Sequence, residues 1–170
     1  DIDNDGDKDL FLSIYDDTSR IFENNGNFAF TEITSNSGIM VPHSAFGASW
    51  GDLNNDGFLD LFVAVRDFNL PCMLFISNGD NTFTDVTQTS GIADINDFAF
   101  CSVLFDYDND GDLDIYLAND KDYIQNKLFE NNGAGLFTDV SSVSGAGIWI
   151  DGMSTTIGDY NQDGFFDIYV

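Results

Sequence analysis

The sequence predicts an all-β protein built from four-stranded antiparallel units of the kind that form the blades of a β-propeller. Three observations carry this prediction. One set of motifs recurs about every 53 residues, short runs alternate apolar and polar residues, and Asn-Gly pairs join two of these runs in each complete unit. No stretch shows a sustained helical period. A unit of this length with four short strands fits one propeller blade.

Four acidic nonapeptides mark the period. Their starts lie 51, 54 and 53 residues apart. A hairpin marker (ENNG or ISNG), an FT marker (FTEIT, FTDVT, FTDVS) and an SG marker (SGI, SGA) follow the first three in the same order. Several markers in one order at one period indicate an internal duplication. The nonapeptides occupy residues 1–9, 52–60, 106–114 and 159–167.

Each complete unit is expected to contain four strands. The first precedes the acidic loop, the second follows it, and the third turns at Asn-Gly into the fourth. Asn-Gly favours a hairpin because both turn residues tolerate positive φ. The expected first strands are 44–51, 99–105 and 152–158; the second are 9–15, 60–65, 114–119 and 167–170; the third are 20–24, 73–77 and 127–131; the fourth are 28–33, 81–86 and 135–140.

These units make residues 1–170 one repeat region of about three and a quarter units. Propellers usually have four to eight blades, so we expect the chain to belong to a larger propeller or array. Its outer units would present open sheet edges, which flanking repeats of the same polypeptide or further copies of the chain would fill. The expected divisions are an incomplete blade 1 at 1–43, blade 2 at 44–97, blade 3 at 98–151 and an incomplete blade 4 at 152–170.

The charge balance excludes several partners. Thirty acidic residues against five basic ones give a formal net charge of −25, so we expect no nucleic-acid partner and no association with an anionic membrane. No apolar run is long enough for a membrane span, so we expect no membrane insertion. Twenty-seven of the acids are Asp, which is depleted in strands and favoured in turns. The acidity therefore indicates acidic loops between strands.

Each nonapeptide follows the pattern D-x-[DN]-x-D-G-x-x-D. In a tight turn, side chains at positions one, three and five converge, Gly at position six permits the reversal, position seven offers its carbonyl and position nine a last carboxylate. An all-oxygen set of this size favours Ca²⁺ over Mg²⁺ and Zn²⁺, so we expect up to four calcium ions. The expected ligands are Asp1, Asp3, Asp5, Asp7 and Asp9; Asp52, Asn54, Asp56, Phe58 and Asp60; Asp106, Asp108, Asp110, Asp112 and Asp114; and Asp159, Asn161, Asp163, Phe165 and Asp167.

Two competing interpretations fit less well. An EF-hand needs Glu at position twelve and flanking helices, whereas this position holds Leu12, Val63, Leu117 and Val170. The stretch 47–51 matches the GxSxG motif of hydrolases, but that motif needs a following helix and His and acid partners. A hydrolase therefore stays a remote alternative, and we expect no enzymatic function.

The motifs together resemble the FG-GAP/VCBS repeats. The resemblance is carried by FGASWGD before the loop, the acidic loop itself, and NNG, FTDVT and SGI after it. Repeats of this family build the seven-bladed propellers of integrin α-subunits and also occur in cartilage-acidic-protein-like and bacterial surface proteins. The resemblance implies an extracellular or cell-surface β-propeller with Ca²⁺ between the first two strands of each blade, the metals bracing one rim and partners binding the other.

Two classes of function remain open on this scaffold. The first is a structural or adhesive module, rigidified by calcium, that contacts a cell-surface or matrix protein. The second is a glycan-binding module with sugar pockets between blades. The first is favoured because Trp50 and Trp149 lie at non-equivalent positions and are expected to fill sheet interfaces. Cys72 and Cys101 fit either two buried thiols or one disulfide, and the sequence leaves this open.

Overall fold

The structure is a computed structural model that describes residues 1–93 and 98–170. It confirms the all-β prediction, since the helices in the described residues are two single turns, α1 (Thr34–Ser37) and α2 (Ser141–Ser144). The strands are β1 (Leu10–Leu12), β2 (Arg20–Asn24), β3 (Phe30–Glu32), β4 (Ala45–Gly51), β5 (Asp60–Val65), β6 (Met73–Ser77), β7 (Phe83–Asp85), β8 (Ala99–Phe105), β9 (Asp114–Gln125), β10 (Lys127–Asn131), β11 (Phe137–Asp139), β12 (Trp149–Asp151), β13 (Thr156–Gly158) and β14 (Asp167–Tyr169).

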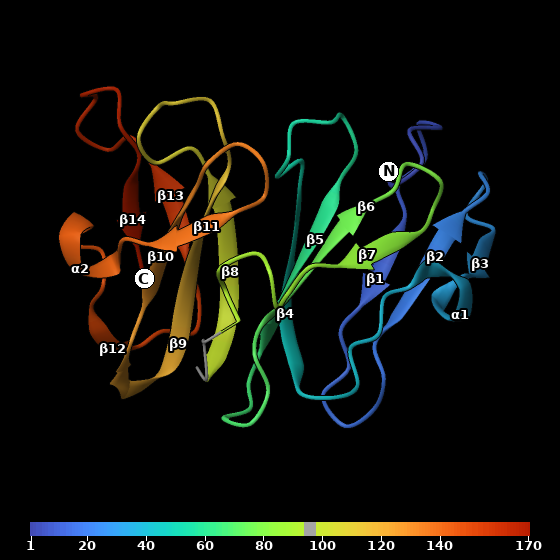
Figure 1. The fold of residues 1–170 in the computed structure, drawn as a ribbon, viewed down its shortest axis with the longest axis horizontal. Coiled ribbons are helices and arrows are strands. Elements are labelled where there is room, and N and C mark those ends of the chain that lie inside the picture. The colour runs from blue at the N-terminus through green and yellow to red at the C-terminus, as the bar shows by residue number, and fades with distance from the viewer. Residues whose placement is uncertain (94–97) are drawn as a thin grey trace.

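The strands form antiparallel sheets that follow the chain order, and Figure 1 shows these sheets side by side. The two complete units pair as β4-β5-β6-β7 and as β8-β9-β10-β11, which confirms four strands per unit. The first unit contributes β1-β2-β3 and the last contributes β13-β14. In the second unit, Trp50 pairs with Leu61 and Leu61 pairs with Phe75, so these three residues lie side by side across three consecutive strands.

One strand was not predicted. β9 continues past the expected end at Asn119 to Gln125, and β12 pairs with this extension, Trp149 opposite Gln125 and Asp151 opposite Asp120. The extension contains Lys121 and Asp122, so its sequence lacks the apolar alternation by which strands are recognised. Partner strands rather than local pattern therefore stabilise it.

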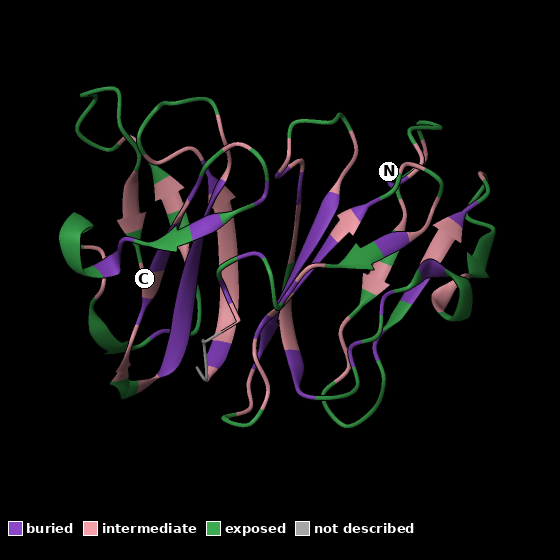
Figure 2. Cartoon of the chain, in the orientation of Figure 1, coloured by how far each residue is buried: buried purple, intermediate pink, exposed green. Residues whose placement is uncertain are grey.

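The apolar core lies between neighbouring sheets, where Figure 2 shows the buried strands. One buried cluster joins Ile21 and Ile39 of the first unit to Leu61 and Phe75 of the second. A second cluster joins the second and third units, and a third joins the third unit to β13 and β14. Neighbouring sheets thus bury the faces that lie between them, as repeat proteins do.

The first strands of neighbouring units approach closely because their residues are small. A Cβ added to Gly47 of β4 would lie 2.8 Å from the carbonyl oxygen of Phe100 on β8. The Ser49 hydroxyl lies 2.8 Å from the Ser102 hydroxyl, again between β4 and β8. The small, apolar stretches before each acidic loop therefore let the inner strands pack together.

The SG marker of one unit contacts the next unit. Gly38 and Gly91 both have positive φ, and a Cβ at Gly91 would lie 2.1 Å from the carbonyl oxygen of Phe137. The same addition at Gly38 would lie 2.4 Å from that of Phe83. Phe83 begins β7 and Phe137 begins β11, so each glycine lies against the fourth strand of the following unit. The repeated glycine thus allows close contact between units.

Candidate metal centre

The acidic loops line one edge of the array. In Figure 1 they lie along the upper edge, where each leads into the second strand of its unit. The second, third and fourth loops connect β4 to β5, β8 to β9 and β13 to β14, and the first leads into β1. Both ends of each later loop are therefore held by paired strands, so equivalent loop residues occupy equivalent positions along the same edge of the array.

The loops share a backbone conformation that their sequence explains. Position six is always Gly and has φ between 91° and 98°. Position four also has positive φ, close to 60°, and in three loops it is Asn, one of the residues that best tolerates this region. These two left-handed residues turn the chain back on itself between the ligand positions.

Backbone amides hold the carboxylates in place, as the third loop illustrates. The amide of Asp110 donates to Asp106 Oδ1 at 3.1 Å, and the amide of Gly111 donates to Asp106 Oδ2 at 3.0 Å. The amide of Asp112 donates to Asp110 Oδ1 at 2.9 Å. Carboxylates from positions one and five are thus oriented by the turn itself before any cation binds.

The carboxylate at position nine joins the loop to the third strand. Asp60 is fully buried, and its two oxygens accept hydrogen bonds from the amides of Leu53 at 2.9 Å and Ser77 at 2.8 Å. Asp114 makes the same pair of contacts with Tyr107 and Asn131. The sequence predicted a ligand at this position and missed this bracing role, which depends on a residue seventeen positions away.

Burial raises the pKa of Asp60 and of Asp114 to about 6. The amide hydrogen bonds oppose this rise, and the nearby carboxylates of the same loops add to it, Asp56 and Asp52 in the second loop. Burial also raises the pKa of Asp108, followed by the charge of Asp110. The loops therefore hold carboxylates whose ionised form would be stabilised by a cation.

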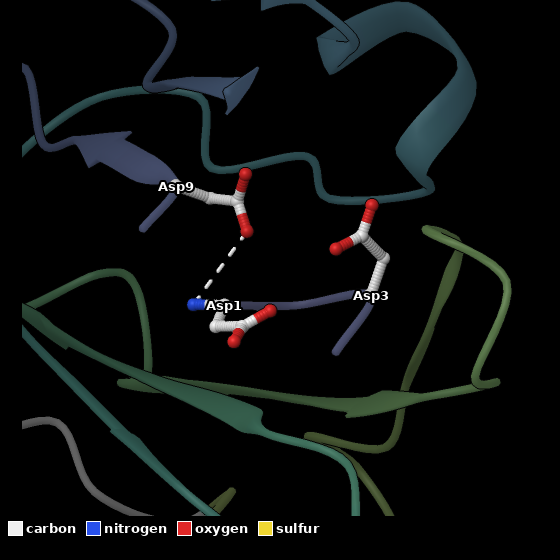
Figure 3. A group of neighbouring side chains, drawn as sticks. All are labelled: Asp1, Asp3 and Asp9. Carbon is white, nitrogen blue, oxygen red and sulfur yellow. Dashed lines mark ion pairs between the residues drawn. The ribbon is translucent and has the colours of Figure 1, made fainter. Parts of the chain in front are cut away.

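Two loops bring carboxylates together in groups that could hold a metal. In the first loop, ligand oxygens of Asp1, Asp3 and Asp9 all lie within 4.8 Å of one another, and Figure 3 shows the three side chains around one space. In the third loop, Asp106, Asp108 and Asp114 form the same group. The position-five carboxylates, Asp5 and Asp110, are not members of these groups.

Oxygen chemistry in these groups fits a hard divalent cation. Every side-chain donor in these groups is a carboxylate oxygen, and Ca²⁺ binds oxygen ligands. Asp1 Oδ1 is buried and accepts no hydrogen bond from the described residues. A buried carboxylate oxygen without a partner is costly, and a bound cation would remove that cost.

The second and fourth loops differ at position three. Asn54 Nδ2 donates to Asp56 Oδ2 at 2.9 Å, and Asn161 Nδ2 donates to Asp163 Oδ2 at 3.0 Å. The side-chain amide at position three thus donates a hydrogen bond to the carboxylate at position five. In the first and third loops position three is an aspartate, so the same carboxylate faces a second negative charge. At position seven, the side chains of Asp7, Phe58 and Asp112 lie against the equivalent glycine of the adjacent hairpin, which is Gly26, Gly79 and Gly133 in turn.

The serine of the GxSxG stretch and the single histidine each contact a neighbouring serine. Ser49 contacts Ser102, and the Nδ1 of His43 lies 2.9 Å from the Ser44 hydroxyl. Trp50 packs edge-on against Phe11 between sheets, as expected. The expectation for Trp149 was wrong, since 62% of its surface is exposed on the short strand β12. Cys72 lies in the core, and Cys101 Sγ lies 3.7 Å from Thr155 Oγ1.

The fold and the loops define a class of protein, a repeat array of propeller-type blades with an acidic loop between the first two strands. Residues 1–63 and 106–170 match the family described as FG-GAP-like repeat, and the chain belongs to that family. Such repeats are typical of extracellular or cell-surface proteins.

Part of the chain is similar in sequence to a human protein. Cartilage acidic protein 1 of Homo sapiens is 28% identical over 94 residues, which cover 55% of this chain. The match spans 14% of the length of that protein. In the described residues of this chain, neither helical turn is long and apolar enough to cross a membrane.

Proposed function

We propose that the chain is an extracellular calcium-binding repeat module with a structural or adhesive role. The observation that carries this proposal is the convergence of three carboxylates in each of two loops, Asp1, Asp3 and Asp9 in one and Asp106, Asp108 and Asp114 in the other. Carboxylates this close repel one another unless a cation lies among them. Oxygen donors without His or Cys favour Ca²⁺ over Zn²⁺.

Calcium would stabilise the blade through position nine. Asp114 is hydrogen-bonded to Tyr107 within the loop and to Asn131 at the end of β10. A cation shared by Asp106, Asp108 and Asp114 would link positions one and three of the loop to this brace. The loop, the second strand and the third strand would then move as one body, which gives a rigid rim suited to a scaffold.

Calcium-dependent melting tests this proposal. Extracellular calcium modules have Kd values on the order of 10⁻⁴–10⁻³ M, and a site at tenfold its Kd adds about 1.4 kcal/mol to the free energy of unfolding. We expect the melting temperature to rise between EDTA and millimolar CaCl₂. In Asp108→Asn the rise should shrink, while Asp122→Asn, an exposed aspartate outside the loops, should keep it. An unchanged melting temperature together with no heat of binding would refute the proposal.

Further repeats are proposed to cover the outer sheets. Leu10 and Leu12 of β1 are each 45% exposed, and Tyr169 of β14 is 75% exposed. The same faces in the inner units are buried against a neighbour. We infer that flanking repeats of the same polypeptide, or further copies of the chain, occupy these faces. A 170-residue chain that remains a compact, well-folded monomer in light scattering would contradict this.

Recognition by the module is proposed to occur through protein–protein contacts, with a cell-surface or matrix protein as the partner. Repeats of this family generally serve as structural or adhesive modules, so we propose no enzymatic activity. A glycan partner is the second candidate, supported by the exposed ring of Trp149. Exposed aromatic rings can stack on sugars, so quenching of Trp149 fluorescence by oligosaccharides, lost in Trp149→Ala, would favour the glycan.

A further inference from the structure

The fourth residue of each acidic loop has a left-handed backbone conformation. Asn4, Asn55 and Asn109 have φ of 61°, 59° and 62°, and Gln162 has φ of 63°. Position four lies between the ligands at positions three and five. A cation bound to those ligands would therefore fix the backbone from which the fourth side chain projects.

Each of the three asparagines donates a hydrogen bond to the following loop. Asn4 Nδ2 lies 3.3 Å from the carbonyl oxygen of Gly57, and Asn109 Nδ2 lies 3.0 Å from that of Gly164. Asn55 Nδ2 lies 2.6 Å from Asp112 Oδ1. One side-chain hydrogen bond thus joins every neighbouring pair of loops in chain order.

Two of these bonds reach the peptide group that orients a ligand. The carbonyl of Gly164 and the amide of Phe165 belong to one peptide unit, and that amide donates to Asp163 Oδ1 at 2.9 Å. Asn109 therefore holds one side of a peptide whose other side holds the position-five carboxylate. Asn4 acts on the equivalent peptide of the second loop, where the amide of Phe58 donates to Asp56 Oδ1 at 2.9 Å.

We propose that the asparagine at position four couples calcium binding in neighbouring loops, so that a cation in one loop raises the affinity of the next. This inference rests on the proposed calcium function. A cation in the third loop orders the backbone at Asn109, and the amide of Asn109 then restrains the peptide that positions Asp163. The fourth loop consequently loses less conformational entropy when it binds its own cation. The coupling is reciprocal, since linkage requires the fourth loop to favour binding in the third equally.

The chain contains its own control. Gln162 occupies position four of the fourth loop with the same φ, and among the described residues it makes no hydrogen bond to another loop. Glycine adopts this φ without strain, so Asn109→Gly and Gln162→Gly remove a side chain while keeping the backbone conformation. Of the two substitutions, only Asn109→Gly removes a hydrogen bond between two described loops.

A double-mutant cycle measures the coupling. CaCl₂ is titrated into the chain labelled at glycine with ¹⁵N, and the amides of Gly111 and Gly164 report the third and fourth loops separately, because each donates to the first aspartate of its own loop. Asp108→Asn/Asp110→Asn disables the third loop. We expect these two substitutions to lower the calcium affinity of the fourth loop about fivefold when Asn109 is present. In the Asn109→Gly background they should leave that affinity unchanged.

Further variants and outcomes complete the test. Gln162→Gly should keep the fivefold effect, and Asn55→Gly should uncouple the second loop from the third, read at Gly57 and Gly111. The inference would be overturned if disabling the third loop lowered the calcium affinity of the fourth loop equally in the wild-type and Asn109→Gly backgrounds. The inference would also be overturned if the wild-type chain bound calcium but disabling the third loop left the affinity of the fourth unchanged. A wild-type chain that binds no calcium would overturn the proposed function as well.

Discussion

The guanidinium of Arg66 and the carboxylate of Asp120 form an ion pair between neighbouring sheets, with Nε 2.9 Å from Oδ2. Arg66 directly follows β5, at the end of that strand away from its acidic loop, and Asp120 lies within β9, six residues after the start of that strand at the third acidic loop. The guanidinium carbon also lies 4.4 Å from the centre of the Phe98 ring. Neighbouring sheets are thus linked by different chemistry at the two edges of the array. Acidic loops lie at one edge, and at the other the Arg66 guanidinium lies between the Asp120 carboxylate and the rings of Phe46 and Phe98.

Replacement of Arg66 by alanine should destabilise the chain. The substitution leaves Asp120 largely buried without its partner, which we expect to lower the free energy of unfolding by about 2–3 kcal/mol in urea denaturation. Lys127→Ala is the control, because Lys127 pairs with the more exposed Asp139 and should cost about 0.5 kcal/mol. Equal losses in the two variants would show that the Arg66 ion pair stabilises the fold no more than an exposed pair does.

The glycines of the SG marker should differ in their tolerance of alanine. Gly91→Ala adds a Cβ 2.1 Å from the Phe137 carbonyl oxygen, whereas at Gly145 the added Cβ has no described atom within 4 Å. Both positions have positive φ, so both variants carry a backbone cost of about 1–2 kcal/mol. We expect Gly91→Ala to lose about 1–3 kcal/mol more, because adjacent units must separate. Thermal unfolding of the two variants side by side decides this, and equal melting temperatures would contradict it.

The effect of pH on stability should change sign with calcium. Asp60 and Asp114 have a pKa of about 6 in the folded chain, against an ordinary value of 3.8. Between about pH 4 and 6 the folded state therefore binds more protons than the unfolded state, and in EDTA stability should fall as the pH rises through this window. With calcium, ionised carboxylates bind the metal, so affinity and its contribution to stability should rise over the same window.

Melting curves from pH 4 to 6 without calcium and with CaCl₂ test this sign reversal. In Asp114→Asn the fall of stability with pH in EDTA should be smaller, because one buried titrating group is gone. A melting temperature that rises with pH in EDTA would show that burial of these two carboxylates does not dominate. Calcium affinity that is equal at pH 7 and pH 4 would contradict carboxylate ligation.

A fourth carboxylate should strengthen the second loop toward calcium while weakening it without the metal. Asn54→Asp replaces an amide that donates to Asp56 by a second negative charge. We expect stability in EDTA to fall by about 1 kcal/mol. The affinity of the second loop for calcium should rise about fivefold, measured by titration calorimetry. Asn36→Asp adds the same charge on the exposed turn α1 and should change neither quantity.

Much of this molecule is encoded locally and could be predicted from the sequence. The acidic loops are nine contiguous residues whose Asp spacing and central glycine dictate the turn, and the structure places Asp106, Asp108 and Asp114 together as the spacing implies. Strand order followed for the same reason, since Asn-Gly hairpins join neighbouring strands such as β6 and β7. That these groups bind calcium stays a prediction, as do the blade boundaries.

Other features depend on residues far apart in the chain. The exposed position of Trp149 follows from β12, which forms only because β9 extends beyond its apolar segment to pair with it. The burial of Asp60 depends on Ser77, which supplies a second amide from the next strand. Neither partner is visible in the local pattern of residues around Trp149 or Asp60.

Neighbouring residues set the repeat period, the four-stranded units and the ligand pattern of the loops, so these features can be predicted from the order of amino acids. Which units touch, and through which atoms, depends on how the sheets pack in three dimensions. Arg66 reaches Asp120, Asn109 reaches Gly164 and Gly91 meets Phe137, each at a separation of about one repeat. Such contacts depend on the angle and distance at which one twisted sheet packs on the next, and packing of the buried side chains between the sheets sets both.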